Sequence, residues 1–312
     1  MILENLIKSS PIVRTAKNSK KQSDKATPFL QWVGGKRQLL EDYKPILPKD
    51  FGNYHELFLG GGALFFELHS IHGNQKKYFI NDLNQELAIT YEQIRNNLEK
   101  VIETCSPMEL KHSKEFYYAV RNIDRTKISE RKYKKLFNAV DKLPHNEIAA
   151  RLLYLNKTCF NSIYRVNSSG LNNVPMGRSL NKKIFNFSNL RDCNNTLQDA
   201  HITNKRYQDC FDNIRKGDLV FLDPPYVPES QTSNFVSYTT DGFSLQDQKE
   251  LNDFYQEVDK KGAFVCLSNT CCDFITNLYS NYNIHKFVVN RNLNAKADKR
   301  KNSSTEVLIT NF

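Results

Sequence analysis

The sequence predicts an α/β protein in which a sheet built from both ends of the chain is interrupted by a long helical segment. Short apolar runs typical of buried strands occur at 54–59 and 77–81, and they recur from residue 202 onward. Between them, residues 86–151 keep apolar side chains at helical spacing. Several of the expected strands end in a glycine turn or an acidic residue, which is where open α/β sheets bind ligands.

Composition limits the class of protein. The 312 residues, 39% hydrophobic and 25% charged, can bury a substantial core. No run approaches ~18 apolar residues and no secretory signal pattern is present, so we expect a cytoplasmic protein without a membrane partner. The net charge of +10 favours an anionic partner. The seven cysteines show no Cys-x-x-Cys spacing, so we expect reduced packing residues and no metal requirement.

The first 27 residues mix Lys, Ser, Asn and Gln with few large apolar side chains, which predicts a flexible basic arm over 1–27. Folded sequence is expected to begin at Pro28. Gly34-Gly35-Lys36 follows a short aromatic segment and precedes a predicted helix. Backbone N–H groups and a lysine at such a turn can bind an anion or a carboxylate.

A glycine turn follows the first expected strand. Gly60-Gly61-Gly62 lies between the strand 54–59 and a helix that starts at Ala63, and glycines let a backbone approach a ligand closely. The strand 77–81 ends at Asp82, roughly 20 residues after the glycines, a separation at which an acidic residue can reach a ribose diol. The alternative is that Asp82 only caps the next helix.

The helical segment has basic outer faces. Apolar residues of 87–101 and again of 133–140 keep helical spacing, so we expect core stripes there. Between Met108 and Lys135, nine Lys or Arg residues stand against four Asp or Glu residues. Solvated surface is the default interpretation of this charge, and a module that faces DNA is the alternative.

A polar, Asn-rich run follows, with so many turn formers between Asn156 and Arg178 that we predict a long ordered loop. Its side chains suit the recognition of bases. Arg165 can bind guanine bidentately, and Asn161 can pair with a base edge or a phosphate. Phe160 and Ile163 can insert into a base stack.

The strongest motif is Asp223-Pro224-Pro225-Tyr226, directly after the apolar run 218–222. Two prolines make a rigid loop without N–H donors whose carbonyl oxygens remain acceptors. A carboxylate, a carbonyl and an aromatic ring then suit one task, which is to hold a planar base by its exocyclic NH2 while the ring stacks on it. Held in this way, the amine can attack a methyl donor. For an isolated motif the alternative is a simple loop spacer.

The C-terminal part of the chain completes the expected sheet. A strand 202–207 ends near Asp209, and Ser244 caps a helix that Gly262 ends. The remaining expected elements are strands 263–268, 284–289 and 306–311 and a helix 273–279. A polar loop with Asn234, Phe235 and Tyr238 is expected to line the base pocket, and a basic loop with Arg291, Lys296, Lys299, Arg300 and Lys301 is expected to bind phosphate.

Three motifs occur in the same order as in a known family. They are the segment 29–37, the turn 60–62 and the motif 223–226. From about Phe29 to Phe312 the chain resembles the DNA adenine methyltransferases of the Dam type, the D12 class. The resemblance implies a Rossmann-like sheet, S-adenosyl-L-methionine as cofactor, double-stranded DNA as partner, and methyl transfer to the 6-amino group of a flipped adenine within GATC. No Pro-Cys pair is present for cytosine ring-carbon methylation.

The resemblance also implies roles for individual residues. Catalysis falls to Asp223, Pro224 and Tyr226. Cofactor binding falls to Trp32, Lys36, Phe58, Gly60, Gly62, Asp82, Asp209 and Asp223. DNA binding falls to Phe160, Asn161, Arg165, Pro175, Arg178 and Arg291, with Arg165 on a guanine, Phe160 in the base stack and Pro175 against a thymine methyl. The implied domains are a catalytic domain of 28–87 plus 201–312 and a helical recognition domain of 88–200 with a hairpin at 158–178.

Two departures and three alternatives remain at this stage. Gln31 stands where many relatives place a basic residue near the outer guanine, so discrimination at that guanine is expected to be looser or supplied from elsewhere. Cys210 stands where an aromatic residue is usual.

RNA adenine and protein-glutamine methyltransferases more often carry Asn at position 223 and lack the hairpin. A catalytically inactive DNA-binding relative is disfavoured by the intact Asp223 and Asp82. The sequence leaves a restriction endonuclease of the same system open, and no direct contact with one is implied.

Overall fold

The chain forms two compact units. One unit comprises Met1–Gly35 and Asn84–Gln198, and the other comprises Lys36–Leu83 and Asp199–Phe312. We call them the helical unit and the sheet unit, and each is described by itself. The computed structural model describes residues 2–11, 25–32, 34, 36–125, 127–130, 135–138, 140–167, 170–178, 183–227, 243–290 and 303–312.

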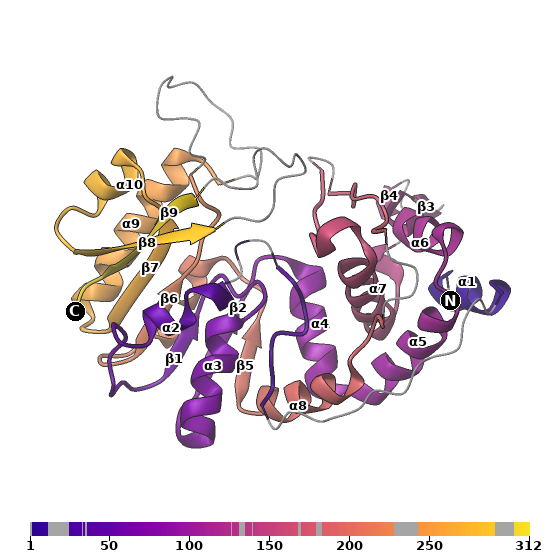
Figure 1. Cartoon of the computed structure of the whole chain (residues 1–312), viewed down its shortest axis with the longest axis horizontal. Coiled ribbons are helices and arrows are strands. Elements are labelled where there is room, and N and C mark those ends of the chain that lie inside the picture. The colour runs from indigo at the N-terminus through magenta and orange to yellow at the C-terminus, as the bar shows by residue number, and fades with distance from the viewer. Residues whose placement is uncertain are drawn as a thin grey trace. The chain divides into compact units, whose positions relative to one another are not determined.

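The sheet unit contains a sheet of seven strands (Figure 1). The strands are β1 (Tyr54–Glu56), β2 (Tyr78–Asn81), β5 (Ala200–Thr203), β6 (Leu219–Leu222), β7 (Phe264–Thr270), β8 (Asn283–Asn290) and β9 (Ser303–Thr310). Their order is β5-β2-β1-β6-β7-β9-β8, and β9 pairs antiparallel with both of its neighbours whereas the other pairs are parallel. The chain order reverses between β1 and β6. In open α/β sheets, ligands bind beyond the carboxyl ends of the strands at such a reversal.

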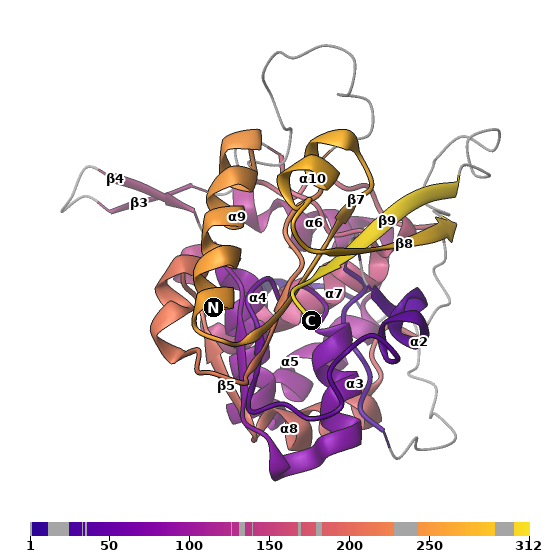
Figure 2. The same ribbon diagram turned by 90° about the vertical axis from the view of Figure 1, so that its left-hand side faces the viewer.

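Helices cover both faces of this sheet (Figure 2). They are α2 (Leu40–Tyr43), α3 (Ala63–His72), α9 (Leu245–Lys260) and α10 (Asp273–Leu278), with short 3-10 turns η1 (Lys36–Gln38), η2 (Gly73–Gln75) and η6 (Tyr207–Asn213). Because successive strand residues point to opposite faces, Val220 and Leu222 pack with α9 and α10 while the Phe221 ring lies 6.4 Å from that of Tyr43 in α2. The strand β6 is therefore buried on both sides.

The predicted boundaries of α9 are confirmed. Ser244 and Asp247 form a reciprocal capping box, and Gly262 follows the helix with a φ of 74°. The other predicted strands and helices of the sheet unit are also confirmed within a few residues. The exception is residues 204–207, because β5 ends at Thr203 and Tyr207 instead begins η6.

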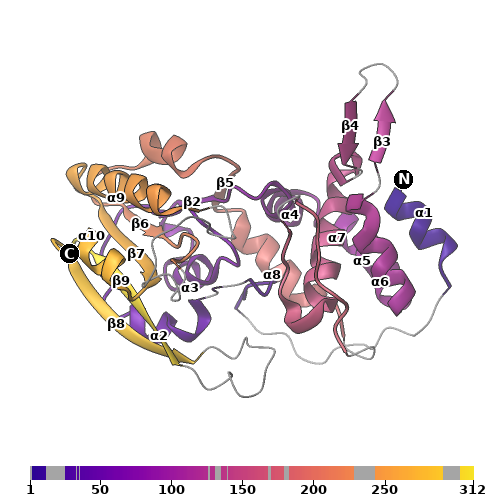
Figure 3. The same ribbon diagram turned by 90° about the horizontal axis from the view of Figure 1, so that it is seen from above.

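The helical unit is built around α7, which packs against α4, α5 and α6 (Figure 3). Its helices are α1 (Ile2–Ser9), α4 (Gln85–Asn96), α5 (Leu98–Leu110), α6 (Lys114–Arg121), α7 (His145–Thr158) and α8 (Phe187–Leu197), with 3-10 turns η3 (Asn122–Arg125), η4 (Val140–Lys142) and η5 (Phe160–Ser162). The apolar stripe over 87–101 is buried, as its spacing predicts. Among the described residues, no helix is long and apolar enough to cross a membrane.

The predicted helical stripe over 133–140 is wrong. The strands β3 (Lys127–Glu130) and β4 (Lys135–Asn138) form an antiparallel pair in which Ile128 is opposite Phe137. This pair extends away from the helices (Figures 2 and 3). The few apolar residues of the stripe span too short a stretch for their spacing to exclude a strand. Pairing with β3, eight residues distant in sequence, decides the conformation.

The predicted flexible arm over 1–27 is wrong at both ends. Ile2–Ser9 forms α1, which buries Leu3 and Ile7 and contacts α5 and α6. Thr27 is held by Asn189, whose side-chain oxygen accepts from the Thr27 N–H at 3.0 Å. The average composition of the segment hides a short amphipathic helix at its start. Residues 12–24 of the arm lie outside the described residues.

Candidate functional site

The sheet unit brings the predicted catalytic and cofactor residues to one edge of the sheet. Asp223 follows β6, and the glycine turn 60–62 follows β1, which is the parallel neighbour of β6. Asp82 follows β2 on the other side of β1. These residues therefore lie at the carboxyl ends of three adjacent strands, where the reversal of chain order predicts a ligand site.

One oxygen of the Asp223 carboxylate is fixed by two donors. Ser268 Oγ donates to Oδ1 at 2.6 Å, and Lys36 Nζ lies 2.8 Å from the same oxygen. Lys36 is only 4% exposed, whereas the Asp223 side chain keeps 20% of its surface exposed. Among the described residues, no hydrogen bond reaches Oδ2 of Asp223 or the carbonyl of Pro224. Both atoms are therefore available as acceptors for the two N–H bonds of an exocyclic amine.

Burial and nearby charges shift the pKa of Asp223 in opposite directions. Burial raises the pKa of Asp223, the Lys36 ammonium opposes that shift, and the nearby Glu306 carboxylate adds to it. Burial also raises the pKa of Glu56, in β1, to about 8. The Glu56 carboxyl accepts hydrogen bonds from Tyr54 Oη at 2.9 Å and from the Phe65 N–H at 3.0 Å. At neutral pH Glu56 is therefore largely protonated.

The rest of the motif is anchored by side chains from α9 and β9. Gln248 Nε2 donates to the Pro225 carbonyl at 2.9 Å, so this second proline carbonyl is already occupied. Tyr226 Oη donates to Glu306 Oε2 at 2.9 Å. The Lys36 ammonium lies 4.7 Å from the centre of the Tyr226 ring. The tyrosine ring is thus held at both its edge and its face.

The glycine turn and Asp82 fit a nucleoside cofactor. Gly60 and Gly62 have positive φ values of 49° and 64°, which only glycine adopts without strain, so the backbone can approach a ligand closely. Asp82 Oδ2 accepts from the Gly60 N–H at 2.8 Å. The cap of α4 is Asn84, whose side chain accepts from the Leu87 N–H at 3.1 Å. The helix-capping alternative for Asp82 is therefore wrong, and its carboxylate belongs to the turn.

Three further residues that were predicted to bind the cofactor lie outside the glycine turn and the Asp223 corner. Phe58 is half-buried, with its ring 5.3 Å from that of Tyr207. Asp209 is exposed in η6, beyond the end of β5. Trp32 belongs to the helical unit, where its ring stacks on that of Tyr164 at 6.0 Å and 18°.

The predicted hairpin has the antiparallel pairing of a hairpin. Isolated bridges join Cys159 to Met176 and Val166 to Asn172. We call residues 158–178 the recognition hairpin. Within it, Asn161, Arg165, Pro175 and Arg178 are exposed and Phe160 is partly exposed. Arg165 Nε donates to Asn173 Oδ1 at 3.3 Å, so its guanidinium is oriented along the opposite arm of the hairpin.

The sequence prediction missed the residues that hold the motif. Ser268 and Asn269 lie near the end of β7, and the polar Ser-Asn-Thr run that ends this apolar strand is the signal that could have identified them. Asn269 Oδ1 accepts from the Val227 N–H at 3.3 Å. Glu306 is a buried acid in β9, directly before the apolar run 307–309. Gln248 gives no comparable signal, because polar residues are ordinary on a helix.

Several predicted positions lie in segments outside the described residues. Arg291 and the basic loop after it lie outside the described residues, and so do Asn234, Phe235 and Tyr238. No group of three or more His, Cys, Asp or Glu side chains suited to a metal ion occurs in the part of the chain that the structure describes.

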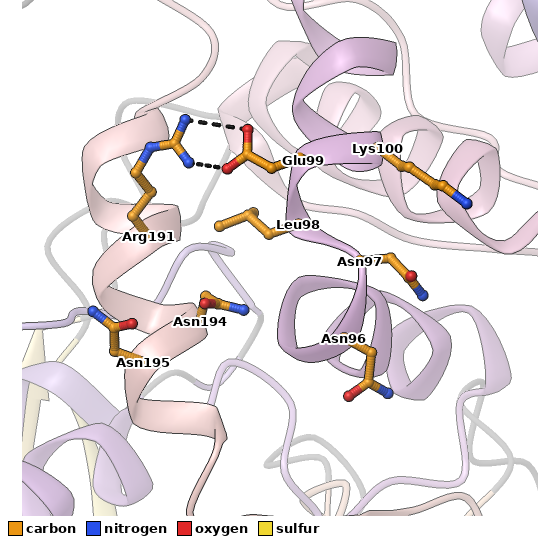
Figure 4. A pocket seen from close by; sticks show the side chains of 8 residues that line it. All are labelled: Asn96, Asn97, Leu98, Glu99, Lys100, Arg191, Asn194 and Asn195. Carbon is orange, nitrogen blue, oxygen red and sulfur yellow. Dashed lines mark hydrogen bonds and ion pairs between the residues drawn. The ribbon is translucent and has the colours of Figure 1, made fainter.

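A polar hollow of about 600 Å³ lies in the helical unit between α8 and the junction of α4 and α5 (Figure 4). Arg191 points toward Glu99 across it, and the two side chains form an exposed ion pair. Asn194 Nδ2 donates to the carbonyls of Ile94 and Arg95 at 2.8 Å each. None of the predicted site residues lines this hollow, and the Asn194 amide joins α8 to the end of α4.

The sheet order, the glycine turn and the Asp223 corner together define a Rossmann-like methyltransferase. A sequence model of the D12 class of N6 adenine-specific DNA methyltransferases matches residues 32–293. The chain belongs to this family and is an adenine-specific DNA methyltransferase. Methyltransferases of this kind generally use S-adenosylmethionine.

Individual relatives support this assignment. The type II methyltransferase M1.LlaDCHI of Lactococcus lactis subsp. cremoris is 38% identical over 287 residues, which cover 91% of this chain and 95% of the relative. The type II methyltransferase M.MjaIII of Methanocaldococcus jannaschii is 38% identical over 298 residues, covering 91% and 99%. The DNA adenine methylase of Haemophilus influenzae is 28% identical over 293 residues, covering 93% and 95%.

Proposed function

We propose that this protein transfers a methyl group from S-adenosylmethionine to the 6-amino group of an adenine flipped out of duplex DNA, within the sequence GATC. The observation that carries the proposal is the state of the Asp223 carboxylate. Its Oδ1 is bound by Lys36 and Ser268, while Oδ2 is directed to no described donor. An exocyclic amine held by Oδ2 and by the Pro224 carbonyl has both N–H bonds directed, so its lone pair is released from the ring.

The residues around this corner would perform the remaining tasks. The Tyr226 ring, oriented by Glu306, would stack on the flipped base. The Gly60–Gly62 turn and Asp82 would hold the cofactor, with Asp82 bound to the ribose diol and the glycines against the methionine part. Further contacts would come from Phe58, Asp209, Trp32 and Lys36. When bound, S-adenosylmethionine supplies an electrophilic methyl group on its sulfonium.

Target choice is assigned to the recognition hairpin. Arg165 would bind a guanine bidentately, Phe160 would enter the base stack, and Pro175 would contact a thymine methyl. Asn161 and Arg178 are exposed on the same hairpin and would bind a base edge or phosphate. Gln31, whose backbone is held by Asn156 through bonds of 3.0 and 2.7 Å, presents an uncharged side chain to any outer guanine.

Transfer of labelled methyl from S-adenosylmethionine to unmethylated duplex DNA tests the activity. N6-methyladenine in the digested product is the expected result, and transfer to RNA or to a protein glutamine would contradict the proposal. Sequencing the methylated adenines in DNA from cells that express the protein tests the target. A motif other than GATC would overturn the assignment of the hairpin and leave the chemistry of the Asp223 corner standing.

The relatives named type II methyltransferases suggest a cellular role in restriction-modification. In that role, a restriction endonuclease of the same system would cut the unmethylated sequence, and the two enzymes would share a DNA site without touching each other. Protection of methylated DNA from an endonuclease encoded by a neighbouring gene would test this role.

A further inference from the structure

A fully buried arginine lies beneath the recognition hairpin. Arg151, in α7, is 0% exposed. Its Nη1 donates to Glu86 Oε2 at 3.1 Å, and its Nη2 donates to Asp124 Oδ2 at 3.1 Å. The same guanidinium also donates to the carbonyls of Val120 at 3.2 Å and Arg121 at 3.1 Å. All three of its nitrogen atoms are therefore engaged by the helical unit.

Each of the two carboxylates bound by Arg151 also holds one arm of the hairpin. Glu86 Oε2 accepts from Tyr164 Oη at 3.3 Å, on the first arm. Asp124 Oδ2 accepts from the Asn172 N–H at 2.7 Å, on the second arm. One guanidinium therefore links the two carboxylates that contact the two arms, while Arg125 and Tyr117 also donate to carbonyls of the second arm.

Arg165 lies directly between these two anchor points. It follows Tyr164 in the chain, and its carbonyl accepts from the Asn173 N–H at 3.3 Å. The next residue, Val166, pairs with Asn172. A change in the spacing of the arms would therefore move the Arg165 guanidinium, and bidentate recognition of guanine requires that group at a defined position.

The buried charges explain why this arrangement has a geometric rather than only a stabilising role. Arg151 and Asp124 are buried, whereas Glu86 is partly exposed and Arg125 is exposed. Arg125 also forms an ion pair with Asp124, so two positive charges face two negative ones. Buried ion pairs contribute little to stability compared with well-packed apolar residues of the same size. Their directional bonds do specify geometry, and here that geometry joins the two arms.

We propose that Arg151, acting through Glu86 and Asp124, is a positioning residue for target recognition. It sets the spacing of the hairpin arms and thereby orients Arg165, and Tyr164 transmits this to the first arm. The inference rests on the proposed role of the hairpin in recognising bases.

Tyr164→Phe is the mildest test, because it removes the bond to Glu86 and keeps the ring that stacks on Trp32. The quantity to measure is the ratio of kcat/KM on the target site to kcat/KM on a duplex with the guanine pair of Arg165 replaced. We expect this ratio to fall by about three- to tenfold, a part of the full effect of an Arg–guanine contact. A ratio equal to that of the wild type would overturn the role of Tyr164.

A double-mutant cycle tests whether the effect passes through Arg165. In an Arg165→Ala background, Tyr164→Phe should cause no further loss of discrimination, because the group that it positions is absent. Additive losses would contradict the proposal. Tyr255→Phe is the matched control, since it removes the hydroxyl bond of another buried tyrosine, to the Val265 carbonyl, in the sheet unit. The control should leave the ratio unchanged.

Arg151→Lys tests the arginine itself while retaining its charge. A lysine cannot reach both carboxylates with directed bonds, so discrimination should fall more than in Tyr164→Phe while kcat on the target site changes little. Should this variant unfold, Asp124→Asn provides the same test with the second arm. If the wild-type protein does not methylate DNA, the proposed function is refuted. If it does and every variant keeps the wild-type discrimination, only this inference is refuted.

Discussion

The Asp223 corner and the recognition hairpin hold their functional groups in opposite ways. At the corner, Asp223 is surrounded by the buried side chains of Lys36 and Ser268, which bind it directly. On the hairpin, Arg165 and Asn161 are exposed, and the bonds that order the loop involve residues beneath it. The corner is thus ordered by direct contacts with buried side chains. The hairpin has a direct contact, from Arg165 to Asn173, and depends otherwise on the layer beneath it.

The difference agrees with the role that we propose for each region. A catalytic carboxylate works best in a dry, preorganised site, where its charge and orientation are set before the substrate arrives. A side chain that recognises a base must stay exposed to reach DNA, so its order has to come from its neighbours. Substitutions at the corner should therefore affect chemistry, and substitutions around the hairpin should affect discrimination.

The largest expected effect is that of Asp223→Ala. Methyl transfer should fall by at least about 10²-fold, the cost of removing one preorganised polar group at a reacting centre. Because this change also removes the carboxylate that forms an ion pair with the buried Lys36, it should lower thermal stability as well. Asp223→Asn keeps an oxygen for Lys36 and Ser268, so it should retain near-native stability and still lose most activity. Asp253→Ala, at an exposed aspartate of α9, serves as a control.

The second prediction concerns Glu56, whose burial raises its pKa from an ordinary 4.5 to about 8. A raised folded-state pKa gives stability that is fully present below pH 4.5 and lost as pH rises toward 8. Between these values the unfolded carboxyl is ionised and the folded one is protonated, so the free energy of unfolding should fall by about 1.4 kcal/mol per pH unit. Glu56→Gln should remove this slope. Urea unfolding at pH 5 to 8 would reveal it, and parallel curves for the two proteins would contradict it.

A smaller effect is expected for Asp82→Ala. Loss of a charged hydrogen bond to the cofactor should weaken S-adenosylmethionine binding by about 1.5 to 3 kcal/mol, measured by calorimetry, without changing DNA binding. Asn84→Ala is the control, because it removes the cap of α4 and should cost about 1 kcal/mol of stability without affecting cofactor affinity. Equal cofactor affinities for Asp82→Ala and the wild type would show that the Gly60 turn works without this carboxylate.

The last prediction concerns the hairpin, where a substitution should affect recognition of a single base pair. Arg165→Ala should reduce discrimination at one guanine by about 1 to 3 kcal/mol, with a smaller effect on total DNA affinity. Competition between duplexes that differ at single positions would measure it. Arg191→Ala, which removes an exposed arginine of α8 from the same unit, should have no such effect. A uniform loss across all sequences would mean that Arg165 binds phosphate.

Much of the fold could be predicted because its signals are local. The strand β6, the glycine turn and the capping box of α9 each occupy a few consecutive residues, and their conformations follow from propensity and burial. The antiparallel pair β3–β4 and the helix α1 could not, since a short apolar pattern is compatible with more than one conformation. Pairing between two neighbouring segments decided the first, and packing against α5 and α6, which are distant in sequence, decided the second.

The same division holds for the site. The sequence alone predicted the acceptor motif 223–226, the glycine turn and Asp82 as a site, because backbone rigidity and residue chemistry are properties of short stretches. Only the tertiary structure decided which atoms are already engaged. Lys36 and Ser268, 187 and 45 residues from Asp223 in the chain, take one of its two carboxylate oxygens. Arg151 joins the hairpin arms through residues 65 and 27 positions away. Such bonds depend on the folded arrangement of distant strands and helices, which no local pattern in the sequence encodes.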